Sequence, residues 1–172
     1  MPYDQHVREA SADPAAAVAR CAVVTLSDTR TPETDKSGRR TQELLREAGH
    51  AVADYQLIPD DPQKLRPLLE ALLARYDVDA VLTNGGTGIS RRDQTVGVVE
   101  RVIEQPLPGF GELFRMLSWE QIGSGAMLSR AVGGVAKGKL LFAMPGSTAA
   151  VELAMTKLIL PEIKHLLREL KK

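Results

Sequence analysis

Hydrophobic residues are arranged along the chain in two alternating patterns, short continuous runs and stripes at helical spacing. The continuous runs predict β-strands at residues 20–26, 80–83 and 140–144, and residues 52–58 form a further predicted strand. The first run is typical of a strand buried on both faces. Between the runs, apolar residues recur every three or four positions, which predicts amphipathic helices. Strands that alternate with helices indicate an α/β fold, here a three-layer αβα sandwich with a mainly parallel sheet.

Caps and prolines place the ends of the first helices. Gly49 stands where a helix carrying Leu44 should end, because glycine readily adopts the left-handed backbone of a C-terminal cap. Asp61 and Pro62 supply a capping residue and a first-turn proline for the next helix, whose leucines form one apolar stripe. Pro67 removes a hydrogen bond inside that stripe, so we expect a kink or a later start there.

The second half of the chain predicts three more helix starts and one turn region. Pro108-Gly109 opens a helix with an apolar face of Phe110, Leu113, Phe114 and Leu117. Gly133-Gly134 and Lys137-Gly138 predict a turn region before the strand at 140–144. Pro145-Gly146-Ser147 then turns the chain into an almost wholly apolar helix, and a last helix is expected to start at Pro161.

The length of the chain predicts a single domain. With 172 residues it is large enough to bury a sizeable core. Residues 1–19 are polar and alanine-rich with no hydrophobic period, so we expect an arm that is loose or packed on a neighbour. Residues 20–172 are expected to form the domain itself.

Charge and cysteine content exclude several classes of protein. The 22 basic and 22 acidic residues give a formal net charge of zero, which does not favour an extended nucleic-acid surface. The single cysteine, Cys21, excludes an internal disulfide framework and opens an apolar run, so we expect a buried thiol in a reducing compartment. No stretch resembles a transmembrane helix or a signal-peptide core. We therefore expect a cytoplasmic protein without a membrane partner.

A glycine-rich segment carries the strongest functional signal. It runs from Asn84 through Gly85, Gly86, Thr87 and Gly88 to Arg91-Arg92-Asp93, between the strand at 80–83 and a helix carrying Val96 and Val99. A strand that passes through clustered glycines into a helix directs backbone N–H groups at an anion. Arginines and a carboxylate directly after the glycines add groups that pair with phosphate and with a metal ion. The segment therefore predicts a phosphate-binding loop.

The alternative for this segment is purely structural. Asp93 would cap the following helix, and the glycines would form a tight turn that binds no ligand. The spacing matches neither the P-loop nor the dinucleotide-binding fingerprint.

Polar segments follow all four predicted strands. They are Ser27-Asp28, Pro59-Asp60, the glycine-rich segment and Pro145-Gly146-Ser147. Because the carboxyl ends of parallel strands share one edge of a sheet, we expect these segments to converge on a ligand site.

Four aspartates on these segments or on the long first loop suggest a magnesium-dependent reaction on a nucleotide: Asp28, Asp35, Asp60 and Asp93. Each has a local alternative as well. Asp60 would belong to a turn, Asp35 would cap a helix, and Asp28 would form an Asx-turn. The three histidines are scattered, so no zinc site is predicted.

Taken together, the motifs resemble the molybdopterin-binding proteins of molybdenum cofactor biosynthesis, the family that includes MogA, MoaB and the gephyrin G domain. The resemblance covers the chain from Arg20 to its carboxyl end. Its motifs are Thr25-Leu26-Ser27-Asp28, Asp35-Lys36-Ser37-Gly38, Ile58-Pro59-Asp60, Thr83-Asn84-Gly85-Gly86-Thr87-Gly88, Arg91-Arg92-Asp93, Pro108-Gly109-Phe110-Gly111-Glu112, Leu128-Ser129-Arg130 and Met144-Pro145-Gly146-Ser147. The segments 114–118 and 144–148 look most like the bacterial MoaB branch.

The resemblance implies an adenylyl transfer, in which the terminal phosphate of molybdopterin attacks the α-phosphate of Mg-ATP. Adenylylated molybdopterin and pyrophosphate would be the products. By resemblance, Asp60 and Asp93 are the catalytic and magnesium-binding carboxylates. The residues expected to bind substrate and phosphate are Ser27, Asp28, Asp35, Ser37, Gly85, Gly86, Thr87, Gly88, Arg92, Pro145, Gly146 and Ser147.

Two other functions remain open at this point. The turn Pro145-Gly146-Ser147-Thr148 differs from the Pro-Gly-Asn-Pro turn usual in active family members, so a molybdopterin-binding protein without catalysis is the first alternative. A nucleotide-binding regulatory or scaffold domain is the second. The resemblance also implies a homo-oligomer, either a trimer or a hexamer made from trimers. The aromatic segment with Phe110, Phe114 and Trp119, together with the arm, fits such an assembly.

Overall fold

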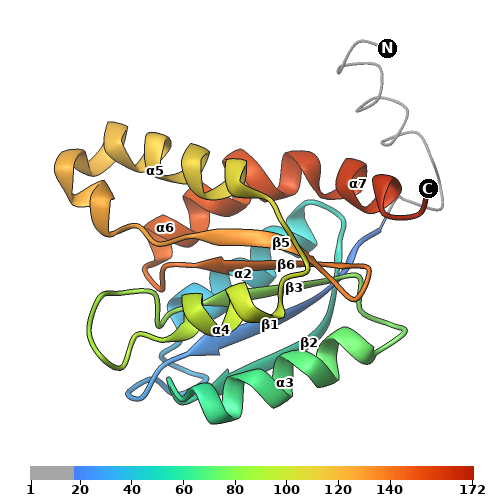
Figure 1. Cartoon of the computed structure of the whole chain (residues 1–172), viewed down its shortest axis with the longest axis horizontal. Coiled ribbons are helices and arrows are strands. Elements are labelled where there is room, and N and C mark those ends of the chain that lie inside the picture. Colours follow the sequence, from blue (N-terminus) through green and yellow to red (C-terminus); the bar gives the residue numbers. More distant parts are fainter. Residues whose placement is uncertain (1–17) are drawn as a thin grey trace.

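The computed structural model describes residues 18–172, which form a three-layer αβα sandwich around one six-stranded sheet (Figure 1). The predicted arm, residues 1–19, lies outside the described residues except for Val18 and Ala19. The strand order is β2-β1-β3-β6-β5-β4. The strands are β1 (Arg20–Leu26), β2 (Ala51–Ile58), β3 (Ala80–Asn84), β4 (Gln105–Pro106), β5 (Val132–Ala136) and β6 (Lys139–Met144).

The four predicted strands pair in parallel and lie next to one another in the sheet, with β2 at its edge. β1 pairs with β2 on one side and β3 on the other, and β3 pairs with β6. β5 and the two-residue β4 extend the sheet in antiparallel orientation beyond β6. The mainly parallel sheet predicted from the hydrophobic runs is therefore confirmed.

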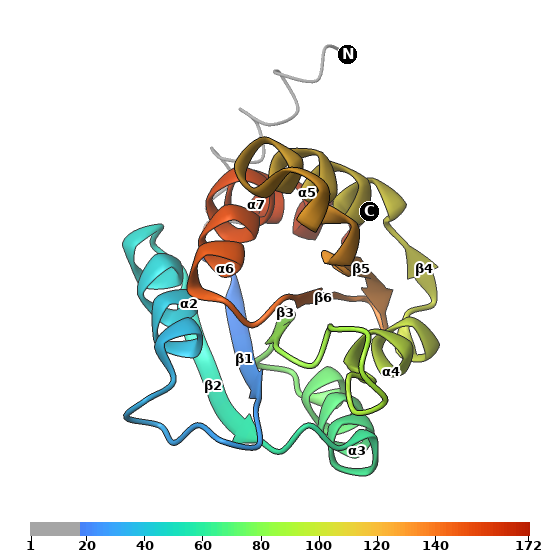
Figure 2. The same ribbon diagram turned by 90° about the vertical axis from the view of Figure 1, so that its left-hand side faces the viewer.

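Helices cover both faces of the sheet (Figure 2). The helices are α2 (Lys36–Glu47), α3 (Pro62–Ala74), α4 (Thr95–Val102), α5 (Pro108–Ile122), α6 (Thr148–Ala154) and α7 (Leu160–Glu169), with a 3₁₀ turn over Gly123–Leu128. One core joins the sheet to α2, α5, α6 and α7, and a second core joins the opposite face to α3 and α4. The predicted leucine stripe of α3 supplies much of the second core. No helix among residues 18–172 is long and apolar enough to cross a membrane.

The prediction that Gly133-Gly134 forms a turn is wrong, because both glycines lie inside β5. A Cβ atom at Gly133 would lie 2.5 Å from the ring of Phe142, and one at Gly134 would lie 2.5 Å from a methyl group of Ile103. Close packing, not chain reversal, explains these glycines. The turn itself is confined to Lys137 and Gly138, whose φ angles are 49° and 69°.

Pro67 lies within α3 and does not delay its start. The helix begins at Pro62, after Asp61 accepts a hydrogen bond from the Gln63 N–H at 2.9 Å. The expectation of a later start is therefore wrong. Pro67 is on the exposed side of the helix, where water can satisfy the carbonyl that the missing N–H leaves unpaired.

The last two predicted helices form one continuous run. A π-helical turn over Met155–Ile159 connects α6 directly to α7, so the chain does not break before Pro161. A proline cannot donate to the carbonyl four residues earlier, and its ring crowds that carbonyl. The wider π turn immediately before Pro161 accommodates this mismatch within the helix.

In α5 the predicted apolar face is only partly buried. Phe110 and Phe114 belong to the core, and the ring of Phe110 meets that of Phe142 edge-on with centroids 4.8 Å apart. Leu117 packs partly against the same core, whereas Leu113 is exposed. Cys21 is fully buried, as predicted, and burial raises the pKa of its thiol to about 12.

The buried imidazole of His50 makes stability depend on pH. The Ala19 N–H donates to Nδ1 of His50 at 3.1 Å, and burial, aided by the charge of Lys164, lowers the pKa of His50. The folded protein therefore binds this proton less readily than the unfolded chain. The contribution of neutral His50 to the free energy of unfolding is complete above the pKa of histidine in the unfolded chain, about 6.5. It is lost as the pH falls below that value.

We expect the free energy of unfolding to fall between about pH 7.5 and about pH 5.5, and to fall less in a His50→Gln variant. Urea titrations of both proteins at the two pH values measure this difference. Glutamine stays neutral and can still accept the Ala19 hydrogen bond. An identical pH dependence in parent and variant would contradict this role for His50.

Candidate functional site

The candidate site lies at the carboxyl ends of the parallel strands, between β1 and β3. From β1 the chain first passes to β2 on one side and then returns to β3 on the other. Loops leaving neighbouring strands in opposite directions open a crevice at such a switch point, which is where α/β sheets bind ligands. Figure 2 shows the loops after these strands gathered beside one another.

Direct contacts confirm that the four strand-end segments converge. The Asp60 N–H donates to Oδ1 of Asp28 at 3.2 Å, which joins the segments after β2 and β1. The Gly85 N–H donates to the Met144 carbonyl at 3.1 Å, which joins the segments after β3 and β6. A Cβ atom at Gly146 would lie only 3.0 Å from Cα of Gly85.

The glycine-rich segment needs its glycines for backbone conformation and for close contact. Gly85 and Gly86 have φ angles of 99° and 63°, in the left-handed region that glycine favours. A side chain at Gly86 would overlap Oγ1 of Thr95 and would lie 2.6 Å from an oxygen of Asp60. The loop therefore brings bare backbone against the carboxylate that follows β2.

Asp93 folds back onto the same loop. Its Oδ2 accepts a hydrogen bond from the Ser90 N–H at 3.0 Å, and a Cβ atom at Gly88 would lie 2.6 Å from that oxygen. Hydrogen bonds from Ser90 outweigh the effect of burial and hold the pKa of Asp93 below its usual value. The capping alternative is wrong, because the N-cap of α4 is Gln94 and Asp93 accepts from Ser90 instead.

Three carboxylates form an acidic cluster beside the glycines: Asp28, Asp60 and Asp93. Burial raises the pKa of Asp60, and the charges of Asp93 and Asp28 raise it further. Arg92 opposes this effect, and its Nη2 lies 2.7 Å from Oδ2 of Asp28. Because Asp28 accepts from the Asp60 backbone and pairs with Arg92, it links loops rather than closing a local Asx-turn.

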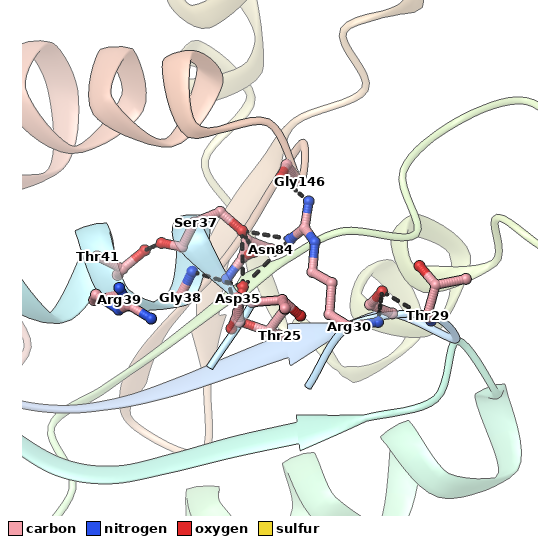
Figure 3. A network of polar contacts seen from close by, with 12 residues as sticks. Thr25, Thr29, Arg30, Asp35, Ser37, Gly38, Arg39, Thr41, Asn84 and Gly146 are labelled. Carbon is pink, nitrogen blue, oxygen red and sulfur yellow. Dashed lines mark hydrogen bonds and ion pairs between the residues drawn. The ribbon is translucent and has the colours of Figure 1, made fainter. Parts of the chain in front are cut away.

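A second polar group surrounds Asp35, as Figure 3 shows. Asp35 is fully buried and caps α2, as its local alternative predicted, by accepting from the Gly38 N–H at 3.0 Å. It also accepts from the Tyr55 hydroxyl at 2.7 Å and pairs with Arg30 at 3.3 Å. Burial alone would raise the pKa of Asp35, but hydrogen bonds from Thr25, Tyr55, Gly38 and Ser37 lower it. The carboxylate therefore stays charged.

Ser37 connects this group to the central strands. Its hydroxyl donates to Oδ1 of Asn84 at 2.7 Å, and the Asn84 amide donates to Oγ1 of Thr25 at 3.0 Å. All three side chains are buried. They tie the start of α2 to the ends of β3 and β1, and so fix one wall of the crevice.

The remaining predicted site residues have structural contacts of their own. Ser27 accepts from the Arg30 N–H at 3.2 Å, and Ser147 caps α6 by accepting from the Ala150 N–H at 3.1 Å. Thr87 is buried within the glycine loop, and Pro145 is half-buried beside Gly146.

Several side chains at the crevice were not predicted: Arg30, Tyr55, Thr95 and Arg130. Arg30 reaches the Gly146 carbonyl at 2.9 Å, and Arg130 donates to the Gly88 carbonyl at 2.7 Å. Arg130 lies in one of the family motifs, which was a usable signal. Thr95 lies two residues after the Arg-Arg-Asp motif, whereas Tyr55 gave no signal beyond its strand.

A metal ion would need ligands from outside the protein here. Within the described part of the chain, no group of three or more histidine, cysteine, aspartate or glutamate side chains is placed to hold an ion. Asp60 and Asp93 nevertheless suit Mg²⁺, which is usually held by one or two carboxylates together with substrate phosphates. The raised pKa of Asp60 also indicates a carboxylate that a cation would stabilise.

Comparison with known proteins places this chain in a family. Residues 22–165 match the family described as a probable molybdopterin binding domain. Molybdenum cofactor biosynthesis protein B of Bacillus anthracis is 56% identical over 88% of this chain and 90% of its own. The protein of the same name from Halalkalibacterium halodurans is 48% identical over 100% and 99%.

Solved structures agree with these sequence relatives. A crystal structure of molybdenum cofactor biosynthesis protein B superposes with a TM-score of 0.88 at 54% identity and covers 90% of this chain and 96% of that chain. The structure of the tungsten cofactor synthesizing protein MoaB from Pyrococcus furiosus superposes with a TM-score of 0.80 at 33% identity. The match covers 91% of this chain and 99% of that chain. The chain therefore belongs to the MoaB family of probable molybdopterin-binding domains in molybdenum cofactor biosynthesis.

Proposed function

We propose that the protein adenylylates molybdopterin with Mg-ATP. An oxygen of the terminal pterin phosphate forms a bond to the α-phosphorus of ATP. The bond from that phosphorus to the bridging oxygen of the β-phosphate breaks, and pyrophosphate leaves. Membership of the family supports molybdopterin as a ligand, and the crevice supports the nucleotide chemistry.

The observation that carries this proposal is the meeting of two carboxylates on the glycine loop. Asp60 arrives from β2 and contacts Gly86, and Asp93 folds back onto Gly88. Bare backbone that can approach phosphate thus lies beside carboxylates that can hold a cation. A turn that binds no ligand would not require two carboxylates from different loops to lie against its glycines.

The protein has little covalent work to do in such a transfer. Asp60 and Asp93 would hold Mg²⁺, which would offset the negative charge of the phosphates. The glycine loop positions phosphate through its N–H groups, while Arg92, paired with Asp28, and Arg130, bonded to the Gly88 carbonyl, add positive charge. The fixed crevice wall around Ser37 and Asn84 holds the reactants in register.

Molybdopterin binding without catalysis is the second candidate function. The turn Pro145-Gly146-Ser147-Thr148 favours it, because it differs from the turn usual in active family members. In this chain Ser147 uses its hydroxyl to cap α6. Incubation with molybdopterin and Mg-ATP separates the two functions, because only the enzyme forms adenylylated product. A regulatory nucleotide-binding domain would bind ATP without binding the pterin.

We also propose that the protein is a homotrimer or a hexamer of trimers. The aromatic segment predicted to form the subunit interface needs correction, because Phe110 and Phe114 are core residues. A group of exposed apolar side chains lies instead along α5 and the following 3₁₀ turn, with 46% to 80% of their surface accessible: Leu113, Met116, Trp119, Ile122, Met127 and Leu128. An apolar surface of this kind is typical of an interface.

We expect light scattering to report a trimer or hexamer at micromolar concentration. Trp119→Glu should shift the protein toward monomer, because it places a charge within the apolar surface. The neighbouring Glu120→Gln, which adds no charge, serves as the matched control. A monomeric parent protein at that concentration would overturn the proposed assembly.

A further inference from the structure

The crevice has two halves of opposite electrostatic character. On one side are the three carboxylates of the acidic cluster, of which Asp60 has a pKa raised by burial and by its like-charged neighbours. On the other side is Arg30, a cation that comes from the loop after β1. A ligand that brings its own divalent cation suits the first half, whereas an anion without a metal suits the second.

Arg30 is held in place by a buried counter-ion. Its Nη1 donates to the Ser37 hydroxyl at 2.6 Å and to Oδ1 of Asp35 at 3.3 Å, and its Nη2 donates to the Gly146 carbonyl at 2.9 Å. Figure 3 shows the guanidinium standing between Gly146 and the Ser37–Asp35 pair. These contacts fix its orientation, so little side-chain entropy remains to be lost when it binds a ligand.

Arg30 still has donors to offer. An arginine has five N–H groups, and within residues 18–172 three of them are engaged by Asp35, Ser37 and Gly146. The Nε–H and one N–H of Nη2 remain for a ligand. The side chain is 31% exposed, whereas Asp35 is fully buried. An incoming anion would therefore meet the cation and not its counter-ion.

We propose that Arg30 binds the terminal phosphate of the pterin substrate, and that the acidic half of the crevice receives Mg-ATP. This assignment rests on the proposed adenylyl transfer and names the residue that sorts its two anionic substrates. The pterin phosphate is the metal-free phosphomonoester of the pair, and a charged phosphate oxygen competes well with the neutral Gly146 carbonyl.

The two halves adjoin where the reaction needs them to. Arg30 contacts Gly146, whose backbone packs against Gly85, and the next residue, Gly86, packs against Asp60. A phosphate beside Arg30 therefore lies next to the glycine loop that would hold the nucleotide phosphates. This arrangement brings the attacking oxygen and the α-phosphate together without placing both anions on one cation.

The test compares binding of molybdopterin with binding of its enzymatically dephosphorylated form, measured anaerobically by pterin fluorescence. In the parent protein, removal of the phosphate should weaken binding at least about tenfold, as expected for hydrogen bonds to a charged group. In Arg30→Ala the intact pterin should bind about as weakly as the dephosphorylated one. Mg-ATP binding, followed by calorimetry, should change less than about twofold.

Three further variants keep the outcome interpretable. Arg30→Lys retains the charge and should recover part of the phosphate preference. Arg30→Ala with Asp35→Asn avoids a buried charge without a partner, in case the single variant fails to fold. Arg39→Ala removes a charge on α2 whose guanidinium donates to the Glu33 carbonyl instead of the crevice, and it should keep the full preference.

Two results would overturn the assignment to Arg30 but leave the proposed adenylyl transfer standing. One is an Arg30→Ala variant that still prefers the phosphorylated pterin as the parent does, and the other is a variant that loses Mg-ATP binding instead. A parent protein that binds neither pterin would overturn the proposed function and the assignment together.

Discussion

Replacing Asp60 or Asp93 with asparagine is expected to lower the rate of molybdopterin adenylylation at least about a hundredfold, the scale on which a lost electrostatic contact to a phosphoryl transition state acts. Asparagine has nearly the same shape as aspartate but lacks the charge that Mg²⁺ requires. Product formation from molybdopterin and Mg-ATP, measured in a single turnover, gives the rate. Pterin binding should largely survive, because neither carboxylate attracts an anionic ligand.

The two variants should differ in stability, which separates chemistry from folding. Burial and the neighbouring charges of Asp93 and Asp28 raise the pKa of Asp60, so the folded protein disfavours its ionised form. Asp60→Asn should therefore melt at the same temperature as the parent or higher. Hydrogen bonds from Ser90 lower the pKa of Asp93, so Asp93→Asn should melt slightly lower.

The control for this pair is Asp61→Asn. Asp61 is next to Asp60, but it caps α3 by accepting from the Gln63 N–H, a bond that asparagine can replace. This variant should adenylylate as the parent does. If Asp60→Asn and Asp93→Asn do the same, the carboxylates serve only the fold.

Gly86→Val should weaken Mg-ATP binding at least about tenfold, because phosphate can no longer approach the loop backbone. A valine there would need a left-handed backbone, with φ of 63°, and its Cβ would displace Thr95 and Asp60. Calorimetry below the melting temperature of the variant measures the loss. Adenylylation should fall with binding, because Asp60 is moved as well.

Gly49→Val is the matched control for the backbone strain. Gly49 also has a left-handed backbone, with φ of 78°, but a Cβ atom there meets nothing within 4 Å. It should lose stability and keep Mg-ATP binding. Unchanged binding in Gly86→Val would mean that the loop is a turn without a ligand.

Local patterns were enough to predict the parts of the site that follow directly from strand ends. Asp60 comes two residues after β2, and the glycine loop comes directly after β3, so the parallel topology alone brought them to one edge. The conformation of Gly86 could be anticipated because few other residues tolerate such a turn. β1, β3 and β6 were equally clear, since their apolar runs are nearly continuous.

Contacts between distant parts of the chain could not be predicted in this way. Arg30 meets Gly146 across 116 residues, and nothing in the local sequence of either indicates the other. Gly133-Gly134 is compatible with a turn or with a strand, and only the packing of Phe142 and Ile103 decides between them. Thr95 and Tyr55 likewise become site residues only through the three-dimensional arrangement of their elements.

The most direct test of the proposed adenylyl transfer follows two labels in one reaction. The protein is incubated anaerobically with molybdopterin, Mg²⁺ and ATP that carries a label on either its α- or its γ-phosphate. If the protein adenylylates molybdopterin, the α label appears on the pterin in amounts equal to the γ label released as pyrophosphate. Molybdopterin that binds while the α label stays in ATP would contradict it, and would assign the protein to pterin binding without catalysis.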